Sequence, residues 1–429
     1  MASKNKLSVV IDIGTSKLVA IAGIKNEAGK FEISGIAKIP SKGIRRGVIF
    51  NIEEVAASVK ELLAALESKI NERIEEVHVA YAGQHMKTVH FQRIKYTSDE
   101  GIVSKSDIDS LYEQAKNAEI EEGYKLVEII PVSYVIDDEI MEKPVGSTGR
   151  KVEANYKLLV IPNSYWVNLL RVFGKLDVKL EKVTLSTLAV AEAVLTRDEK
   201  EMGVIVLDIG CGTTNLAIYH DNRLIHTAVI PFGGDVVTND IKEGCSILLK
   251  WAEQLKVQYG QALGDFADDQ KVVTIPGHNG WEPKEISFKS LAFIIQARIE
   301  EIVDSVNFQI ERSGIADQLG AGIVLTGGTS NLDNIIALVK FRTGLDVRKA
   351  NLVLGLHERH KEIQSSENYT ALGMLSLVEK RTVSVLPVIE KGEKIKKQKE
   401  PGKFSSRINN FVQGVLNLVD DDNEDVPLK

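Results

Sequence analysis

Two short segments of the chain repeat one pattern of hydrophobic and polar positions. In the first, an apolar run rich in β-branched residues ends near Asp12, and a polar turn leads into a new apolar run at Leu18. In the second, a similar run ends near Asp208, and the chain becomes apolar again at Leu216. Such runs predict buried strands, and the glycine-containing turn between them predicts a hairpin. We interpret the two segments as one structural device used twice.

The two predicted turns carry residue types suited to binding phosphate. Glycine lets backbone N–H groups approach a ligand closely, and Ser or Thr hydroxyls add further donors. The carboxylates of Asp12 and Asp208 are suited to a hydrated divalent cation beside that phosphate. One such turn is weak evidence, because ordinary turns share its residues, whereas two copies favour a nucleotide clamped between two similar domains. The candidate phosphate-binding residues are Gly14, Thr15, Ser16, Lys17, Gly210, Gly212, Thr213, Thr214 and Asn215.

A third glycine-rich turn follows an apolar strand later in the chain. Gly327 and Gly328 end this strand, and the segment 331–334 is expected to open a helix. Glycines at this place let the backbone lie flat against a nucleoside, and a helix N-terminus favours nearby negative charge. Taken alone, the segment is also compatible with a plain strand-to-helix turn.

These three motifs, in this order and spacing, resemble the nucleotide-binding superfamily of actin, the heat-shock chaperones and the sugar kinases. Within it the chain is similar to the FtsA family of bacterial cell-division proteins, through the stretches 229–241, 252–256 and 324–328 and a further match at the C-terminal end. The resemblance implies an α/β fold: duplicated actin-like nucleotide-binding domains around a central cleft, an inserted small α+β subdomain and a C-terminal amphipathic helix.

The same resemblance implies ATP and Mg²⁺ as cofactors. Asp12 and Asp208 would orient Mg²⁺ and its waters, while Gly234, Gly327 and Gly328 would approach the sugar and base. Glu253 and Lys256 lie three residues apart on one helix face, where they either hold the nucleoside or form a solvated ion pair. If hydrolysis occurs, Asp208 or a carboxylate such as Glu192 would position water. Any ATPase activity is expected to be slow, with the nucleotide setting the angle between domains.

Pattern and resemblance together divide the chain into segments. The insertion is expected to contact neighbouring molecules in a polymer, and the fourth subdomain to bind the C-terminal tail of the tubulin-like protein FtsZ. The expected segments are 1–82, 164–200 and 357–380 for the first core subdomain, 83–163 for the insertion, 201–231 and 314–356 for the second core subdomain, 232–313 for the fourth subdomain, 381–403 for a linker and 404–420 for an amphipathic helix. The expected helices span 52–70, 105–120, 234–245, 249–260, 289–313 and 369–375, and 262–283 is expected to be rich in loops.

The last expected helix has a strongly apolar face that must be buried. It could dock on its own domain, on a partner helix or on a membrane surface, and the resemblance favours the membrane. One such tail would bind weakly, and several tails on one polymer would bind well. The acidic run 420–422 opposes attraction to anionic lipids. The candidate membrane-contacting residues are Phe404, Ile408, Phe411, Val412, Val415, Leu418 and Val419.

The amino-acid composition favours a globular protein whose main partner is not a nucleic acid. The 429 residues are 44% hydrophobic, which is typical of a globular protein with a substantial core. A net charge of −7 argues against nucleic acid as a main partner. The two cysteines, Cys211 and Cys245, are far apart and fit a reducing compartment. We expect no signal peptide, and no apolar run reaches the ~18–20 residues of a spanning helix.

Three functions compete at this point. The first is an actin-like ATP-binding protein that polymerises, works with other divisome proteins and anchors the FtsZ ring to the cytoplasmic face of the cell membrane at the division site. The second is a small-molecule kinase of the same superfamily, which would need a catalytic Asp facing a sugar or acid pocket and has no use for a membrane-seeking tail. The third is a heat-shock-type chaperone, for which too little chain follows residue 380 to form a peptide-binding domain.

Overall fold

The structure is a computed structural model, and it describes residues 7–26, 29–98, 101–277, 282–357 and 363–379. All of these belong to one compact unit. The predicted linker and amphipathic helix, with all seven candidate membrane residues, lie outside the described residues. None of the described helices combines the length and the apolarity needed to cross a membrane.

The first half of the unit is built on a five-stranded sheet with β1 (Ser8–Ile13) at its centre. β1 runs antiparallel to β2 and parallel to β6, and β11 continues the sheet parallel to β6. The other strands, from one edge to the other around β1, are β3 (Phe31–Pro40), β2 (Lys17–Lys25), β6 (Glu76–Tyr81) and β11 (Lys179–Leu185). A small hairpin of β4 (Ile44–Arg45) and β5 (Val48–Ile49) follows β3 in sequence.

The second half repeats this sheet strand for strand. Its central strand, β12, runs antiparallel to β13 and parallel to β17, as β1 does to β2 and β6. The order is β14 (Arg223–Ile230), β13 (Thr214–His220), β12 (Val204–Ile209), β17 (Ile323–Thr326) and β18 (Val347–Lys349). The matching order and directions confirm the prediction that one device is used twice.

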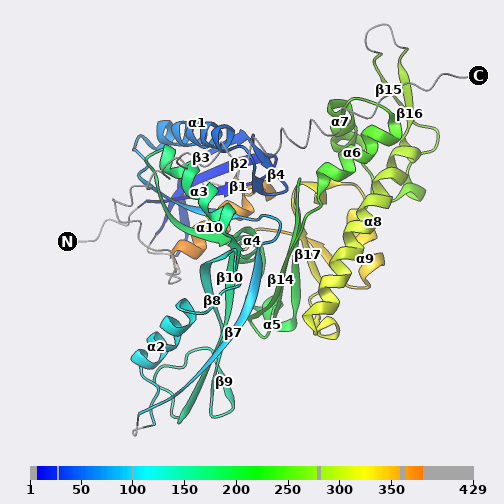
Figure 1. Cartoon of the computed structure of the whole chain (residues 1–429). Coiled ribbons are helices and arrows are strands. Elements are labelled where there is room, and N and C mark those ends of the chain that lie inside the picture. Colours follow the sequence, from blue (N-terminus) through cyan, green and yellow to red (C-terminus); the bar gives the residue numbers. More distant parts are fainter. Residues whose placement is uncertain (1–6, 27–28, 99–100, 278–281, 358–362, 380–429) are drawn as a thin grey trace, which may run out of the picture. The chain divides into compact units, whose positions relative to one another are not determined.

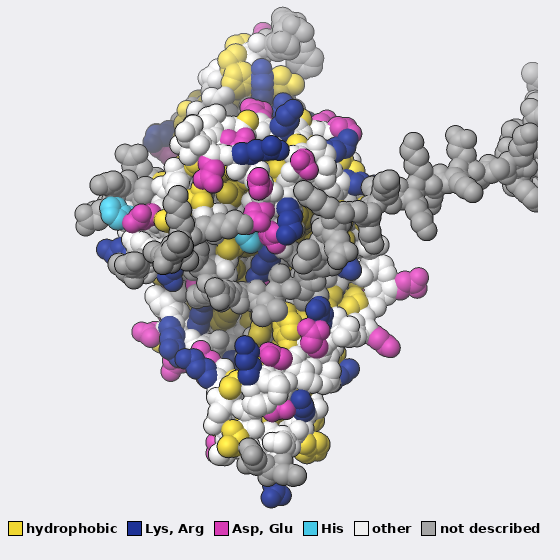
Figure 2. Space-filling model, turned by 90° about the vertical axis from the view of Figure 1, so that its left-hand side faces the viewer, with side chains coloured by type: hydrophobic (Ala, Val, Ile, Leu, Met, Phe, Trp, Pro, Cys, Tyr) yellow, Lys and Arg dark blue, Asp and Glu magenta, His cyan; other side chains and the backbone are white. Residues whose placement is uncertain are grey.

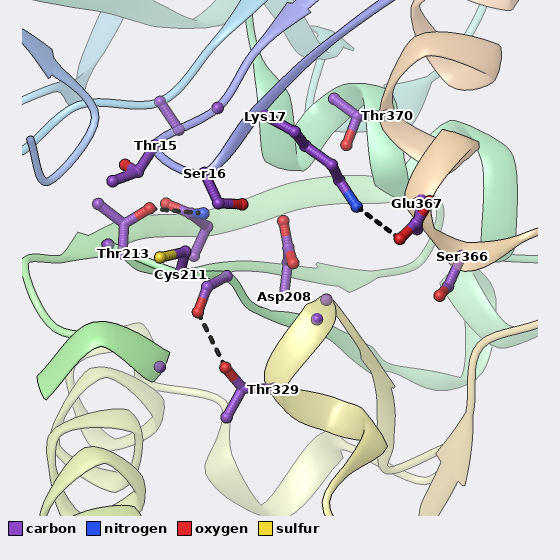
Figure 3. Close-up of a pocket in the computed structure, with 18 of the residues that line it drawn as sticks. Thr15, Ser16, Lys17, Asp208, Cys211, Thr213, Thr329, Ser366, Glu367 and Thr370 are labelled. Atoms are coloured by element: carbon purple, nitrogen blue, oxygen red, sulfur yellow. Dashed lines mark hydrogen bonds and ion pairs between the residues drawn. The ribbon is translucent and has the colours of Figure 1, made fainter. Parts of the chain in front are cut away.

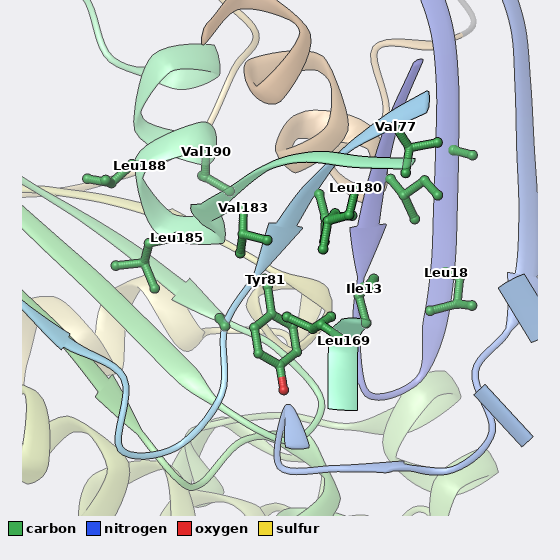
Figure 4. Close-up of a cluster of buried hydrophobic side chains, with 14 of the residues drawn as sticks. Ile13, Leu18, Val77, Tyr81, Leu169, Leu180, Val183, Leu185, Leu188 and Val190 are labelled. Atoms are coloured by element: carbon green, nitrogen blue, oxygen red, sulfur yellow. The ribbon is translucent and has the colours of Figure 1, made fainter. Parts of the chain in front are cut away.

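The central strands are apolar on both faces because helices cover both. Ile11 and Ile13 pack into one hydrophobic cluster, and Val10, on the opposite face of β1, packs into another. The first cluster contains side chains of α1 and α3, and Figure 4 shows its centre, where Tyr81 and Leu169 lie beside Ile13. α10 contacts β1, β2 and β6, and its side chains belong to the second cluster. Burial on both faces explains the continuous apolar runs in the sequence.

Helices link these sheets and match most of the predicted ranges. The covering helices of the first half are α1 (Ile52–Ile70), α3 (Asn163–Lys175), α4 (Ser186–Val194) and α10 (Tyr369–Glu379), with α5 (Arg197–Met202) before β12. The second half carries α6 (Gly234–Cys245), α7 (Leu249–Tyr259), α8 (Phe288–Ser313) and α9 (Ile335–Thr343) (Figure 1). Short 3₁₀ turns occur at η1 (Gly264–Phe266), η2 (Ala316–Gln318), η3 (Gly328–Asn331) and η5 (Ser366–Asn368).

Two local predictions are wrong, and the loop-rich prediction for 262–283 holds in its described residues except at one strand. The segment 262–283, expected to be rich in loops, contains β15 (Val272–Ile275), which pairs with β16 (Lys284–Ser287). Residues 331–334 do not open a helix, because η3 occupies Gly328–Asn331 and α9 starts only after Asn334, whose φ is 61°. The helix expected over 105–120 ends at Lys116, since Asn117 leaves the helical conformation and its side-chain amide donates to the Glu113 carbonyl at 2.8 Å.

An inserted α+β region lies between β6 and α3. α2 (Lys105–Lys116) packs against its sheet, and the two enclose a hydrophobic core of their own. The strand order is β7 (Lys87–Tyr96), β10 (Lys151–Pro162), β8 (Tyr124–Ile136) and β9 (Glu139–Met141). A buried ion pair, Lys182 Nζ to Glu128 Oε1 at 2.8 Å, joins β8 of the insertion to β11 of the first sheet.

Charged side chains are mixed by sign on the molecular surface. Figure 2 shows Lys and Arg interspersed with Asp and Glu over one face. The described residues visible on this face therefore form no continuous basic stripe of the kind that binds a nucleic-acid backbone.

Candidate functional site

The two hairpin turns line one cavity of about 380 Å³. Its walls also include the turn at Gly327, the start of α6, one face of α7, and residues of η5 and α10. Figure 3 shows Lys17 from the first turn and Asp208 and Thr213 from the second half around the same space. The sequence motifs that are far apart in the chain therefore meet at one site.

The two turns have the same hydrogen-bonded geometry. The Gly14 N–H donates to the Lys17 carbonyl at 3.2 Å, and the Gly210 N–H donates to the Thr213 carbonyl at 2.9 Å. A Cβ atom at Gly14 would lie only 2.8 Å from that carbonyl oxygen, which explains why glycine stands there. The turns also touch each other, since a Cβ at Gly212 would lie 2.6 Å from Thr15 Oγ1.

Two acidic side chains, Asp12 and Asp208, line the cavity at the ends of the central strands. Burial raises the pKa of Asp12 to about 7, and the negative charge of Asp208 adds to this rise. Burial likewise raises the pKa of Asp208 to about 6. The positive charge of Lys17 acts in the opposite direction on both carboxylates, as do Thr370 for Asp12 and Asn215 for Asp208. Because both carboxylates lose solvation here, a cation bound beside them would stabilise their charged forms.

The third turn is fastened to the second hairpin. The Thr329 hydroxyl donates to the Gly210 carbonyl at 3.0 Å, and the Gly234 N–H donates to the same oxygen at 2.9 Å. Gly327 has a φ of 92°, and a Cβ there would lie 2.4 Å from the Asp208 carboxylate. The second hairpin, the start of α6 and the third turn thus form one hydrogen-bonded wall.

Glu253 and Lys256 of α7 differ in their freedom to contact a ligand. The Lys256 ammonium donates to the Gly234 carbonyl at 2.8 Å and to Thr238 Oγ1 at 2.7 Å, and it pairs with Glu253 Oε2 at 2.7 Å. An ammonium carries three hydrogens, so these protein contacts use all of them. The Glu253 side chain stays half exposed at the cavity. Lys256 therefore positions Glu253 and the start of α6.

The structure brings most of the predicted site residues together and leaves two of them out. Thr214 is fully buried and its hydroxyl donates to the Phe232 carbonyl at 2.9 Å. Glu192 is held on α4, where the Ser376 hydroxyl donates to it at 3.1 Å and Lys200 Nζ lies 3.8 Å away. Neither residue lines the cavity, and the position of Glu192 does not fit the expected role in orienting water. The predicted residues that line it are Asp12, Gly14, Thr15, Ser16, Lys17, Asp208, Gly210, Gly212, Thr213, Asn215, Gly234, Glu253, Lys256, Gly327 and Gly328.

Several lining residues have no counterpart in the sequence prediction. Ser366, Glu367 and Thr370 come from η5 and α10, late in the chain, and Ser186 comes from the start of α4. The cluster of polar residues directly before an apolar helix was the signal available for the first three. That pattern does not indicate which part of the fold these residues face. Only the packing of α10 against the first sheet brings their side chains to the cavity.

Comparison with known families identifies two regions of the chain. The family model described as cell division protein FtsA matches residues 205–373. The model described as the SHS2 domain inserted in FTSA matches residues 83–160, which include most of the inserted sheet and α2.

Whole proteins and solved structures agree with these matches. The cell division protein FtsA of Pseudomonas aeruginosa is 34% identical over 336 residues, covering 78% of this chain and 80% of that protein. FtsA of Escherichia coli K12 is 31% identical over 384 residues, covering 87% and 90%. MreB5 of Spiroplasma citri bound to ADP has a TM-score of 0.53 at 16% identity, covering 87% of this chain and 96% of that chain. A chain of the PilM–PilN type IV pilus biogenesis complex has a TM-score of 0.60 at 16% identity, covering 86% and 98%.

The structural likenesses show an actin-like α/β fold, and the second family model shows an SHS2 domain inserted in it, as the sequence predicted. The curated relatives carry a cell-division role and do not favour the kinase alternative. The chain belongs to the FtsA family of bacterial cell-division proteins.

Proposed function

We propose that this protein binds ATP with Mg²⁺ in the cavity and that the bound nucleotide controls its assembly into a polymer during cell division. The observation that carries the proposal is the pair of matching hairpin turns, which meet a third glycine turn around a cavity of about 380 Å³. That volume lies in the range of small-molecule sites. The fold is shared with MreB5 of Spiroplasma citri, for which structures bound to ADP and to AMPPNP exist.

The residues around the cavity supply what a nucleotide triphosphate needs. Backbone N–H groups of the two turns and the hydroxyls of Thr15 and Thr213 bind phosphate oxygens, and Lys17 neutralises their charge. Gly234, Gly327 and Glu253 face the sugar and base. Mg²⁺ is commonly held by one or two carboxylates together with phosphates and water, so Asp12 and Asp208 fit it. Among the described residues no group of three or more His, Cys, Asp or Glu is arranged to hold a metal ion.

Hydrolysis, where it occurs, is proposed to be slow. Asp208 would orient the attacking water, and Asn215 and Lys17 both favour its charged form. The nucleotide's larger effect is on conformation, because a ligand held by both halves stabilises one angle between them. That angle would decide whether neighbouring molecules make polymer contacts.

We further propose that the fourth subdomain, 232–313, binds the C-terminal tail of FtsZ and that the segment 404–420 attaches the polymer to the cytoplasmic face of the cell membrane. The support for the fourth subdomain is the family resemblance, and exposed apolar side chains such as Phe266 and Val272, which are 73% and 52% exposed, are available there to a peptide. The support for the membrane segment is the apolar face in its sequence. Other divisome proteins would join this assembly.

The Asp208→Ala variant tests the assignment of the cavity. Removing this carboxylate is expected to weaken ATP binding in the presence of Mg²⁺ by about 10- to 100-fold, the worth of a charge-assisted contact. Without Mg²⁺ the affinity should change little or improve, because a negative charge beside the phosphates is lost. Calorimetric titration with and without Mg²⁺, alongside polymer sedimentation, measures both effects.

The exposed Asp198→Ala on α5 is the matched control for this loss of one carboxylate. It should bind ATP as the wild type does. ATP affinity and polymerisation that both persist unchanged in Asp208→Ala would show that the nucleotide lies elsewhere.

Liposome co-sedimentation tests the membrane proposal. The full chain should pellet with anionic vesicles, more strongly with ATP and Mg²⁺, because many weak tails act together on a polymer. A chain lacking residues 404–429 should stay in the supernatant, and Phe411→Glu should do the same at full length. Asn410→Glu adds the same charge on the polar face and should still pellet. Pelleting that does not depend on the tail would contradict the proposal.

A further inference from the structure

A single carboxylate at the cavity wall is shared by two lysines. Glu367, in η5, lies with Oε1 3.2 Å from Lys17 Nζ and with Oε2 2.7 Å from Lys38 Nζ. The three charged groups come from η5, the first hairpin and β3, so the cluster depends on the tertiary structure. Figure 3 shows the Lys17 ammonium turned from its hairpin toward Glu367, above Asp208.

Lys17 is the lysine of the cavity that can change its partner. Lys17 and Lys256 both line the cavity, and the Lys256 ammonium already contacts three protein oxygens in the described structure. The Lys17 side chain is 33% exposed, its ammonium pairs with one Glu367 oxygen, and its charge also favours the ionised forms of Asp12 and Asp208. Its backbone is fixed by the turn, since its carbonyl accepts the Gly14 N–H. A long side chain on a fixed backbone can swing toward a ligand without any change of fold.

Glu367 lies in a short turn that leads into a closely packed helix. η5 leads directly into α10, and α10 crosses α4 so closely that a Cβ at Gly373 would lie 1.7 Å from the Ala189 carbonyl oxygen. This close packing of α10 on α4 resists sliding of α10 toward a ligand. Any exchange of partners between Glu367 and an incoming anion must occur through the side chains.

We propose that Glu367 is a positioning residue that takes the place of a phosphate on Lys17 and competes with nucleotide phosphates for it. This inference rests on the proposed nucleotide site. When a phosphate binds, Lys17 leaves the carboxylate for the ligand, and Lys38 remains beside Glu367 to balance its charge. A ligand without phosphates has no anionic group that can pair with Lys17, so the ion pair between Lys17 and Glu367 stays intact. Glu367 thereby sets how much phosphate charge a ligand must bring in order to bind tightly.

A partly exposed ion pair with no further role would behave differently. Such pairs contribute about 0–1 kcal/mol to stability, and removing one leaves ligand affinity unchanged. Competition predicts instead that losing the carboxylate makes Lys17 more available and improves the binding of phosphate-bearing ligands. The two cases therefore differ in a measurable affinity.

The test is titration calorimetry of the full-length Glu367→Gln protein with ATP, ADP and adenosine. The dissociation constants of ATP and ADP should fall by about three- to fivefold, the factor that corresponds to an ion pair of this exposure. Adenosine should bind as it does to the wild type. Glu61→Gln, an exposed glutamate of α1, is the control and should change none of the three. Glu367→Ala provides a second variant without the carboxylate, and thermal unfolding checks that each variant is folded.

A double-mutant cycle with Lys17→Met separates competition from simple repulsion between Glu367 and the phosphates. If Glu367 acts through Lys17, the gain from Glu367→Gln should largely vanish in the Lys17→Met background. A gain of equal size in that background, or an unchanged ATP affinity in Glu367→Gln, overturns the inference while leaving the nucleotide site in place. A folded wild type that binds neither ATP nor ADP overturns the proposed function and this inference together.

Discussion

Replacing Gly327 by valine is expected to abolish measurable ATP binding while most of the fold persists. The residue has a φ of 92°, and a Cβ there would lie 2.3 Å from the Ile209 carbonyl oxygen and 2.4 Å from Asp208 Oδ1. A valine would therefore displace the end of the central strand and the Asp208 carboxylate, both at the cavity. With a ψ of 165°, Gly327 lies in a backbone region that essentially only glycine adopts, so a valine there adds strain on the order of 1–3 kcal/mol.

A substitution at Gly344 serves as a control that separates backbone strain at positive φ from steric intrusion into the cavity wall. This residue follows α9 with a φ of 72°, and a Cβ there would meet no atom within 4 Å. Gly344→Val therefore also places a β-branched residue at positive φ, in the left-handed region (ψ of 1°, against 165° at Gly327), but without the steric intrusion. Calorimetric titration with ATP and Mg²⁺, and thermal unfolding of both variants, would make the comparison. We expect Gly344→Val to lose less stability than Gly327→Val and to bind ATP normally, and equal ATP affinities in the two variants would refute the geometry assigned to Gly327.

The sequence predicts the two hairpin turns of the site, because their residues lie close together in the chain. A strand, a four-residue turn and a returning strand fix their own register, so the spacing from Asp12 to Lys17 and from Asp208 to Thr213 already determines both hairpins. The alternation of side chains along a strand explains why Thr214, which was predicted to bind phosphate, does not line the cavity. Thr213 lines the cavity, and Thr214, the first residue of β13, turns its side chain to the opposite side.

The part that was missed depends on contacts between distant segments. Glu367 reaches the cavity because α10 packs on α4 across a glycine, and no periodicity in either helix encodes that crossing. The β15 and β16 pair was missed for a related reason, since each strand has four residues and shows no clear alternation of burial. Glu192 was assigned by resemblance, and its helix directs it to Lys200 and away from the cavity.

Removing the buried carboxylate of Glu128 should cause one of the largest losses of stability in this protein. Glu128 and Lys182 are 4% and 6% exposed at the junction between the SHS2 domain and the first sheet. The Thr184 hydroxyl donates to Glu128 Oε1 at 3.4 Å, while Oε2 is buried without a hydrogen-bond partner among the described residues. In Glu128→Ala the lysine charge would stay buried without its counter-charge, at a cost of about 3–5 kcal/mol in the free energy of unfolding.

The paired substitution Glu128→Leu with Lys182→Met gives the decisive comparison. Two apolar side chains remove the need to desolvate either charge, so the double variant should be about as stable as the wild type or more stable. Glu113→Ala, which breaks the exposed pair with Lys116 on α2, should cost less than about 1 kcal/mol. Urea unfolding followed by circular dichroism measures all three. If the double variant is as unstable as Glu128→Ala, the loss of stability does not come from an unpaired buried lysine. The ion pair itself would then stabilise the junction between the inserted domain and the core.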